Sequence, residues 1–217
     1  MRERLPLVLV SGPWGGGTSA VAGALARAGL QAPGPYVTTN DPRTSNTYEM
    51  MAFRALMRDL ASEKTMQRHV TFDQALDRLR QFRDTMLLPS IQTDAAAPPL
   101  MLKHALSALF LRELSLLFDV QIVGVLRPLP EIEATRARRG WGKSFGRKGA
   151  EVVYQNLFEC LVASDTPFHL IRYSELLKQP GDQLDAVLRF CRFTPTAHQR
   201  ADALECINPS EAAKALA

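Results

Sequence analysis

The pattern that decides the fold lies between Leu5 and Gly29, in the residues LPLVLVSGPWGGGTSAVAGALARAG. Leu5 to Val10 is a short apolar run without polar alternation, which is typical of a strand buried on both faces of a parallel sheet. Thr18 to Gly29 continues as a run of small residues whose apolar members recur at helical spacing. The order is strand, glycine-rich loop and helix, which predicts an α/β protein.

The loop between that strand and that helix, GPWGGGTS, resembles a phosphate-binding loop. Its main-chain N–H groups can cradle phosphate oxygens, and the following helix N-terminus adds partial positive charge. The loop that binds nucleoside triphosphates has a lysine where this chain has Thr18, so a kinase or GTPase is disfavoured. Binding of another phosphorylated nucleotide is still expected, and a tight turn that binds nothing is the alternative. The candidate binding residues are Gly12, Gly15, Gly16, Gly17, Thr18 and Ser19.

Strand and helix patterns alternate along the rest of the chain, which predicts a three-layer α/β/α fold around a central, mainly parallel sheet, like that of P-loop NTPases. Two amphipathic patterns, Thr47 to Leu60 and Phe72 to Leu88, predict a helical insertion at about 46–90. The further expected strands are Leu100 to Lys103, Gln121 to Leu126 and Phe168 to Ile171, and the further expected helices are Leu106 to Phe118, Pro130 to Gly140, Glu151 to Ala163, Ser174 to Leu177, Gln183 to Cys191 and a helical tail.

Length and composition favour one domain over residues 1–217, since 217 residues with 46% apolar content can build one α/β core but not two. The 3 cysteines suit neither a disulfide framework nor zinc-ligand spacing. We therefore expect no metal, and we expect the protein to lie in a reducing cytoplasm. The apolar run within Met1 to Val10 is shorter than the about 7 to 15 residues of a signal core. No segment approaches the roughly 20 apolar residues of a membrane span.

The formal net charge of +4 is concentrated in one part of the chain. Between Arg127 and Lys148 there are seven basic residues and two acidic residues. Such a patch suits nucleic acid, anionic lipid or a small polyanionic ligand, and it is also compatible with a solvated surface that has no partner. Charge alone does not choose among these.

Two segments together resemble the bacterial sulfotransferases. Val8 to Leu30 is similar to the opening of that family, whose loop holds the 5′-phosphosulfate of 3′-phosphoadenosine 5′-phosphosulfate (PAPS). Val123 to Trp141 is similar to its second nucleotide motif, a strand that ends in Arg-x-Pro and a helix with Ser or Thr eight residues after the Arg. Fainter likenesses are Asn46 to Glu49, Lys103 after the second strand, and Ile171 to Leu177.

The resemblance implies transfer of a sulfuryl group from PAPS to a hydroxyl or amine of a small-molecule or carbohydrate acceptor, without nucleic acid as partner and without a metal. It places Arg127 and Thr135 on the 3′-phosphate. The residues support this, because Arg127 follows a predicted strand at the sheet edge where open α/β sheets bind ligands. An Arg that only caps a surface turn is the alternative.

One residue departs from the family pattern. The family loop has Arg or Lys where this chain has Gly15, and that cation stabilises charge on the leaving group. Either Lys103, Lys143 or another cation replaces it, or the chain binds nucleotide without efficient turnover. The alternatives are therefore a non-catalytic nucleotide- or polyanion-binding module of the same fold, and a phosphotransferase with an unusual loop.

A general base would assist the acceptor, and the candidates are His104 and Glu49. His104 follows Lys103 at a strand end, but a plain polar residue at a helix start is an equal interpretation. Glu49 has the alternative of a solvated helix start. His169 is expected to be a core residue. Gly140 to Gly149 carries basic residues among glycines, which predicts a mobile flap over the nucleotide.

Overall fold

The computed structural model describes residues 4–39, 41, 46–94 and 96–207. Its centre is a four-stranded sheet with the strand order β4-β1-β5-β6, in which every neighbouring pair is parallel. A separate antiparallel pair, β2 and β3, lies beside it. The predicted α/β fold with a parallel sheet is therefore confirmed. Met1 to Glu3 and the end of the expected helical tail lie outside the described residues.

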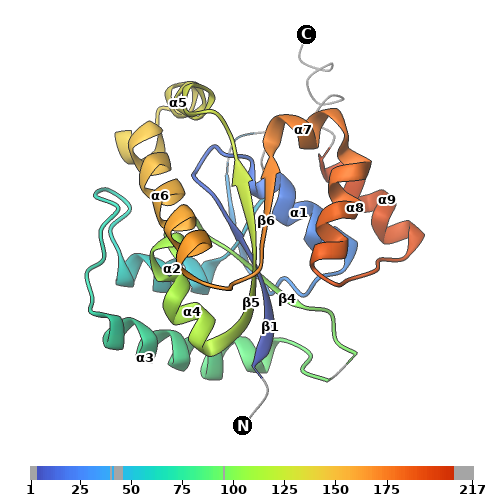
Figure 1. Cartoon of the computed structure of the whole chain (residues 1–217), viewed down its shortest axis with the longest axis horizontal. Coiled ribbons are helices and arrows are strands. Elements are labelled where there is room, and N and C mark those ends of the chain that lie inside the picture. Colours follow the sequence, from blue (N-terminus) through green and yellow to red (C-terminus); the bar gives the residue numbers. More distant parts are fainter. Residues whose placement is uncertain (1–3, 40, 42–45, 95, 208–217) are drawn as a thin grey trace.

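The elements follow in chain order (Figure 1). The strands are β1 (Leu5–Ser11), β2 (Tyr36–Thr38), β3 (Asn46–Met50), β4 (Leu100–Lys103), β5 (Phe118–Leu126) and β6 (Phe168–Arg172). The α-helices are α1 (Thr18–Ala28), α2 (Met51–Leu60), α3 (Phe72–Phe82), α4 (Leu111–Leu117), α5 (Leu129–Arg138), α6 (Arg147–Ala163), α7 (Tyr173–Lys178), α8 (Pro180–Phe190) and α9 (Ala197–Ile207). The shorter helical turns are η1 (Arg83–Leu87), η2 (Leu88–Ser90), η3 (Ala105–Phe110) and η4 (Lys143–Phe145).

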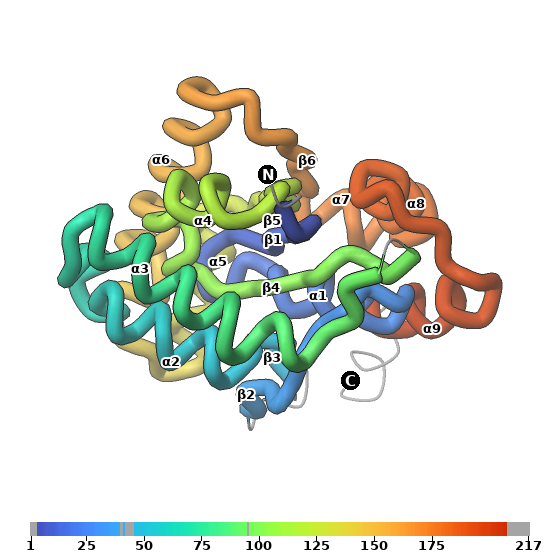
Figure 2. Tube along the Cα trace, turned by 90° about the horizontal axis from the view of Figure 1, so that it is seen from below, coloured from blue at the N-terminus to red at the C-terminus, as the bar shows by residue number. Residues whose placement is uncertain are grey.

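Helices cover both faces of the sheet, as the view from below shows (Figure 2). The strand β1 shows why both faces are covered, because its side chains point alternately into two hydrophobic cores. Leu7 and Leu9 enter the core under α2, α3, α4 and α6, whereas Val8 and Val10 enter the core under α1, α7, α8 and α9. All four are at most 1% exposed. A strand that is apolar on both faces thus fixes a three-layer arrangement.

The insertion begins differently from the prediction. The pattern from Thr47 to Leu60 predicts one helix, but residues 46–50 form β3 and the helix starts at Met51. The Asn46 side chain accepts a hydrogen bond from the Tyr48 N–H (2.8 Å), and the Thr47 hydroxyl accepts one from the Glu49 N–H (3.2 Å). These local bonds compete with a helical first turn, so the prediction of a helix from Thr47 was wrong for its first residues, and the alternative of a solvated helix start for Glu49 was wrong too, because Glu49 is buried.

Two other helices are shorter than predicted. The expected helix Leu106 to Phe118 is a 3-10 segment, η3, followed by α4, and Phe118 already pairs with Leu5 in the sheet. The expected helix Phe72 to Leu88 is regular only to Phe82 and continues as the π-helical turn η1. In both cases apolar residues continue at helical spacing across the boundary, so the pattern does not mark it. Within the described ranges, no helix is both long and apolar enough to cross a bilayer.

Candidate active site

The glycine loop, Gly12 to Ser19, connects β1 to α1 at the carboxyl edge of the sheet. Gly16 N–H closes a turn onto the Pro13 carbonyl (2.9 Å). The N–H groups of Gly15, Gly17, Thr18 and Ser19 donate to no described residue. The Ser11 hydroxyl, at the end of β1, is also buried without a partner among the described residues. Unused donors at a helix N-terminus fit an anionic ligand such as a phosphosulfate.

Arg127 follows β5 and reaches the glycine loop from the neighbouring strand. Its Nη1 donates to the Gly15 carbonyl (2.8 Å) and to the Thr135 hydroxyl (3.2 Å), and its Nε donates to Glu131 (3.0 Å). The side chain is 22% exposed. The structure therefore brings together three residues from the two predicted nucleotide motifs, 112 positions apart along the chain.

Gly15, which stands at the family's cation position, has a backbone that favours glycine. Its φ is +72°, in the left-handed region, and a Cβ there would lie 3.1 Å from Thr135 Cγ2. A side chain at this position would be strained and would crowd the helix that carries Thr135. The conformation of the loop at Gly15 therefore disfavours a cationic side chain at this position.

Two tyrosines to which the sequence patterns assign no role complete this part of the site. The Tyr154 hydroxyl accepts a hydrogen bond from the Arg127 N–H (2.8 Å) and donates to the Arg127 carbonyl (3.0 Å), which fixes the main chain after β5. The Tyr173 ring lies against Gly17 and 5.1 Å from the Arg127 guanidinium, and burial raises the Tyr173 pKa. Of the two tyrosines, only Tyr173 could have been found from the sequence, because it directly follows the strand β6 at the same edge of the sheet.

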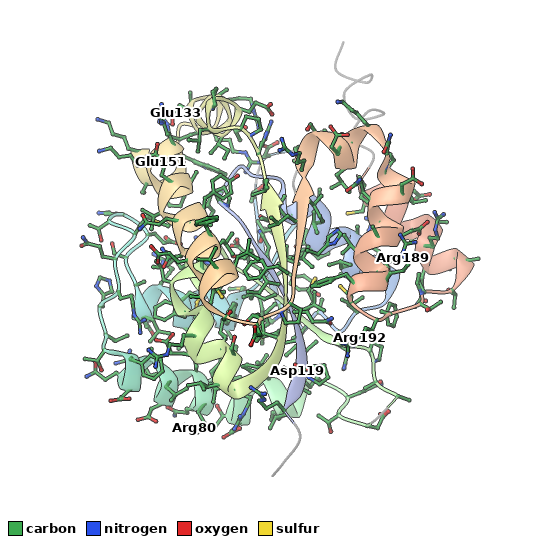
Figure 3. The ribbon with its side chains drawn as sticks, viewed as in Figure 1. Arg80, Asp119, Glu133, Glu151, Arg189 and Arg192 are labelled. Carbon is green, nitrogen blue, oxygen red and sulfur yellow. The ribbon has the colours of Figure 1, made fainter. Side chains whose placement is uncertain are left out.

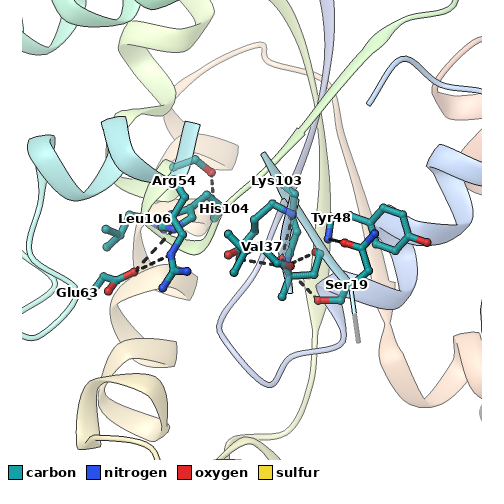
Figure 4. A network of polar contacts seen from close by, with 12 residues as sticks. Ser19, Val37, Tyr48, Arg54, Glu63, Lys103, His104 and Leu106 are labelled. Atoms are coloured by element: carbon teal, nitrogen blue, oxygen red, sulfur yellow. Dashed lines mark hydrogen bonds and ion pairs between the residues drawn. The ribbon is translucent and has the colours of Figure 1, made fainter. Parts of the chain in front are cut away.

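Lys103, the last residue of β4, lies on the other side of β1 (Figure 4). Its Nζ donates three hydrogen bonds, to Ser19 Oγ (3.1 Å), to the Thr47 carbonyl (3.0 Å) and to Glu49 Oε1 (3.0 Å). The Lys103 and Glu49 side chains are only 5% and 7% exposed. Burial is the largest single influence and would raise the Glu49 pKa, but the charge and hydrogen bond of Lys103 together with the other neighbouring charges outweigh it, so the pKa is lowered and the carboxylate is ionised.

His104 is buried, and its side chain is 0% exposed. Its Nδ1 accepts a hydrogen bond from the Leu106 N–H (3.1 Å), and its ring meets Trp14 of the glycine loop edge-on. Burial lowers the His104 pKa to about 4, so the ring is neutral at pH 7. Because Nδ1 is an acceptor, Nε2 carries the proton, and His104 is a hydrogen-bond donor in this geometry. His169, expected to be a core residue, is half-buried against Phe190.

Carboxylates pair with several of the basic residues in and after α5. Glu133 accepts from Arg136 Nε (2.7 Å) and from the Arg147 N–H (3.1 Å), and Arg147 pairs with Glu151. Figure 3 shows Glu133 on α5 and Glu151 on α6 at the same end of the molecule. Gly149, one of the glycines of the predicted flap, lies in the first turn of α6. The last residues of the predicted flap thus belong to α6, and the flap itself stays a prediction.

The site thus joins unused loop amides, Arg127 with Thr135 on one side, and Lys103 with Glu49 on the other. The described part of the chain holds no cluster of three or more His, Cys, Asp or Glu side chains suited to a metal ion. These features define an α/β protein with a glycine loop whose unused N–H groups lie at the carboxyl edge of its sheet.

The fold is that of the bacterial sulfotransferases. Sulfotransferase STF1 from Mycobacterium tuberculosis is similar over 93% of this chain and 71% of its own, with a TM-score of 0.60 and 17% identity. The sulfotransferase domain of the Synechococcus olefin synthase is similar over 92% of this chain and 77% of its own, with a TM-score of 0.58 and 15% identity. A sulfotransferase domain from the curacin biosynthetic pathway is similar with a TM-score of 0.57 and 17% identity. No family model and no curated protein sequence matches the chain.

Proposed function

We propose that the chain transfers a sulfuryl group from PAPS to a hydroxyl or amine of a small-molecule or carbohydrate acceptor. The observation that carries this proposal is the contact of Arg127 with both Gly15 and Thr135. PAPS has a phosphosulfate and a separate 3′-phosphate, so it needs two anion cradles at a fixed separation. The loop amides supply one cradle, and Arg127 with Thr135 supplies the other.

The chain's residues have separate roles in this reaction. The unused amides of Gly15, Gly17, Thr18 and Ser19 hold the phosphosulfate. The acceptor oxygen or nitrogen forms the new bond to sulfur as the bond from sulfur to the phosphate oxygen breaks, which leaves adenosine 3′,5′-bisphosphate. Lys103, which touches Ser19, stabilises the charge that develops on the leaving phosphate.

Glu49 is the better candidate for the base that takes the acceptor proton. Its carboxylate is ionised, whereas the free nitrogen of His104 already carries a proton. In this assignment Lys103 holds the Glu49 carboxylate in place and connects it to Ser19 of the glycine loop. A cytoplasmic location and the absence of a nucleic-acid partner remain predictions.

Calorimetry with adenosine 3′,5′-bisphosphate and with ATP plus magnesium tests the proposal. We expect micromolar binding of the bisphosphate and none of ATP, because Thr18 replaces the lysine that a triphosphate requires. The reverse result would exclude a sulfotransferase and favour the phosphotransferase.

A non-catalytic nucleotide-binding module is the second candidate, and Gly15 favours it. No side chain of the glycine loop supplies a cation, and Lys103 already has three acceptors. A panel of hydroxyl and amine acceptors with labelled PAPS separates the two. Bisphosphate binding without transfer to any acceptor would support the module.

A further inference from the structure

A second charged cluster lies beside the Lys103–Glu49 pair and is centred on Glu63 (Figure 4). Arg54 and Arg58 approach the Glu63 carboxylate from one face of α2, with Nε–O distances of 3.7 Å and 3.4 Å. His104 Nε2 approaches from the end of β4, 4.0 Å from Glu63 Oε1. Three nitrogen groups from two elements therefore surround one carboxylate. We call Arg54, Arg58 and His104 the oxyanion cup.

The fit between the cup and Glu63 is poor. None of the three nitrogens makes a hydrogen bond to the carboxylate, and Glu63 Oε1 and His104 Nε2 are both buried without a partner among the described residues. Buried polar groups of this kind are rare and need an explanation. Glu63 occupies the cup but does not serve as a hydrogen-bond acceptor for its donors.

The charges and protons of the cup favour an anion with more oxygens. Two arginines face a single carboxylate, so a positive charge is left over, and the neutral His104 ring offers its Nε2 proton. Glu63 Oε1 faces two of the three nitrogens and reaches neither. A sulfate or phosphate group presents three outer oxygens, one for each donor, and pairs well with guanidinium groups.

We propose that the oxyanion cup recognises a tetrahedral oxyanion, a sulfate or phosphate ester carried by the acceptor, and that Glu63 occupies the cup until the acceptor binds. The inference rests on the proposed function for the identity of the acceptor. The position agrees with it, because His104 directly follows Lys103 and packs against Trp14 of the glycine loop. The acceptor's hydroxyl or amine would then lie between the cup and the loop.

Tryptophan fluorescence can test the cup directly, since the chain has only two tryptophans, Trp14 and Trp141. Both lie against Phe145, and Trp14 also contacts His104. Inorganic sulfate is titrated into the full chain at constant ionic strength maintained with sodium chloride. The variants are Glu63→Gln, the double variant Arg54→Gln with Arg58→Gln, and the matched control Arg78→Gln, which changes an exposed arginine on α3.

We expect Glu63→Gln to bind sulfate at least fivefold more tightly than the parent, because the competing charge is removed. The double arginine variant should bind at least tenfold more weakly, and Arg78→Gln should equal the parent. Unchanged affinity in Glu63→Gln, or parental affinity in the double variant, would overturn the proposal. Melting curves check folding, and Arg58→Gln alone, at a 58% exposed side chain, is the substitute if the double variant unfolds.

Two further arms separate the explanations. Arg127→Gln identifies sulfate bound at the glycine loop: if it removes the Glu63-sensitive signal, the cup is refuted. Adenosine bisphosphate binding is measured on the Glu63 variant and on the Arg54 and Arg58 double variant, and it should not change in either. If the parent fails to bind bisphosphate but keeps the Glu63-sensitive response, the proposed function fails and the cup stands. If the parent binds bisphosphate but lacks that response, the cup fails and the proposed function stands.

The chemical class is tested with phenyl sulfate, phenyl phosphate and benzoate on Glu63→Gln. We expect benzoate to bind at least tenfold more weakly than the tighter-binding ester. The ester that binds more tightly identifies the group that the acceptor carries. Equal or tighter binding of benzoate would show that the cup takes carboxylates, and would overturn the tetrahedral assignment.

Discussion

Two cations end the two strands that flank β1, and their surroundings differ. Lys103 at the end of β4 is 5% exposed and donates to three acceptors, one of them a buried carboxylate. Arg127 after β5 is 22% exposed and contacts a main-chain carbonyl, a hydroxyl and a half-exposed carboxylate. A buried, fully bonded cation holds the site together, whereas a partly exposed one can exchange its partners for a ligand. Substitutions on the two sides of β1 should therefore have different effects.

The largest effect is expected from Lys103→Met. It leaves the Glu49 carboxylate buried without its partner, which costs about 3 to 5 kcal/mol of unfolding free energy. Urea unfolding measures this, and the double variant with Glu49→Gln should recover more than half of the loss. A loss under about 1 kcal/mol in the single variant would mean that the pair does not hold the β4 side together.

The next effect concerns pH and His104. The pKa falls from 6.5 in the unfolded chain to about 4 in the folded protein, so between these values the unfolded chain binds the extra proton. Stability therefore falls as the pH is lowered from 6.5 to 4, by about 3 kcal/mol if the whole shift is expressed. Unfolding curves of the parent and of His104→Asn isolate this contribution by difference. Parallel pH profiles would contradict a buried, neutral histidine.

Arg127→Ala should change binding more than folding. Loss of a charge-assisted contact should weaken adenosine 3′,5′-bisphosphate by about 1.5 to 3 kcal/mol in calorimetry. Adenosine 5′-phosphosulfate lacks the 3′-phosphate and serves as the control, with nearly unchanged affinity. Equal losses for both ligands would assign Arg127 to the fold and remove the contrast with Lys103.

Thr135→Val is expected to act in the same direction and least strongly. The hydroxyl contributes one neutral hydrogen bond, worth about 0.5 to 1.5 kcal/mol of bisphosphate affinity. The shape of the side chain is kept, but its hydrogen bonds with Arg127 and the Glu131 carbonyl are lost, so the melting temperature should fall only slightly. A larger loss than that of Arg127→Ala would reverse the assigned roles.

The β5 side is predictable from the sequence and much of the β4 side is not. A strand, a glycine loop and an Arg after a second strand are local patterns, and parallel topology then brings their ends to one edge. The sequence pattern predicts a helix at Glu49, where the structure has a strand. The side-chain hydrogen bonds of Asn46 and Thr47 favour that strand, and such bonds produce no periodic pattern of apolar residues in the sequence. The partners of Lys103 lie 54 to 84 positions away, and no local pattern encodes them.

The order of the strands also sets when the glycine loop can form during synthesis. The strand β1 is made first, yet both of its neighbours come later, with β4 ending at Lys103 and β5 at Leu126. At about 5 to 20 residues per second, β1 waits on the order of ten seconds for its second partner. During that time an unpaired apolar strand is exposed, and contacts of such high sequence separation form slowly. We expect a fragment that ends before β5 not to fold, because β1 would lack its second partner in the sheet.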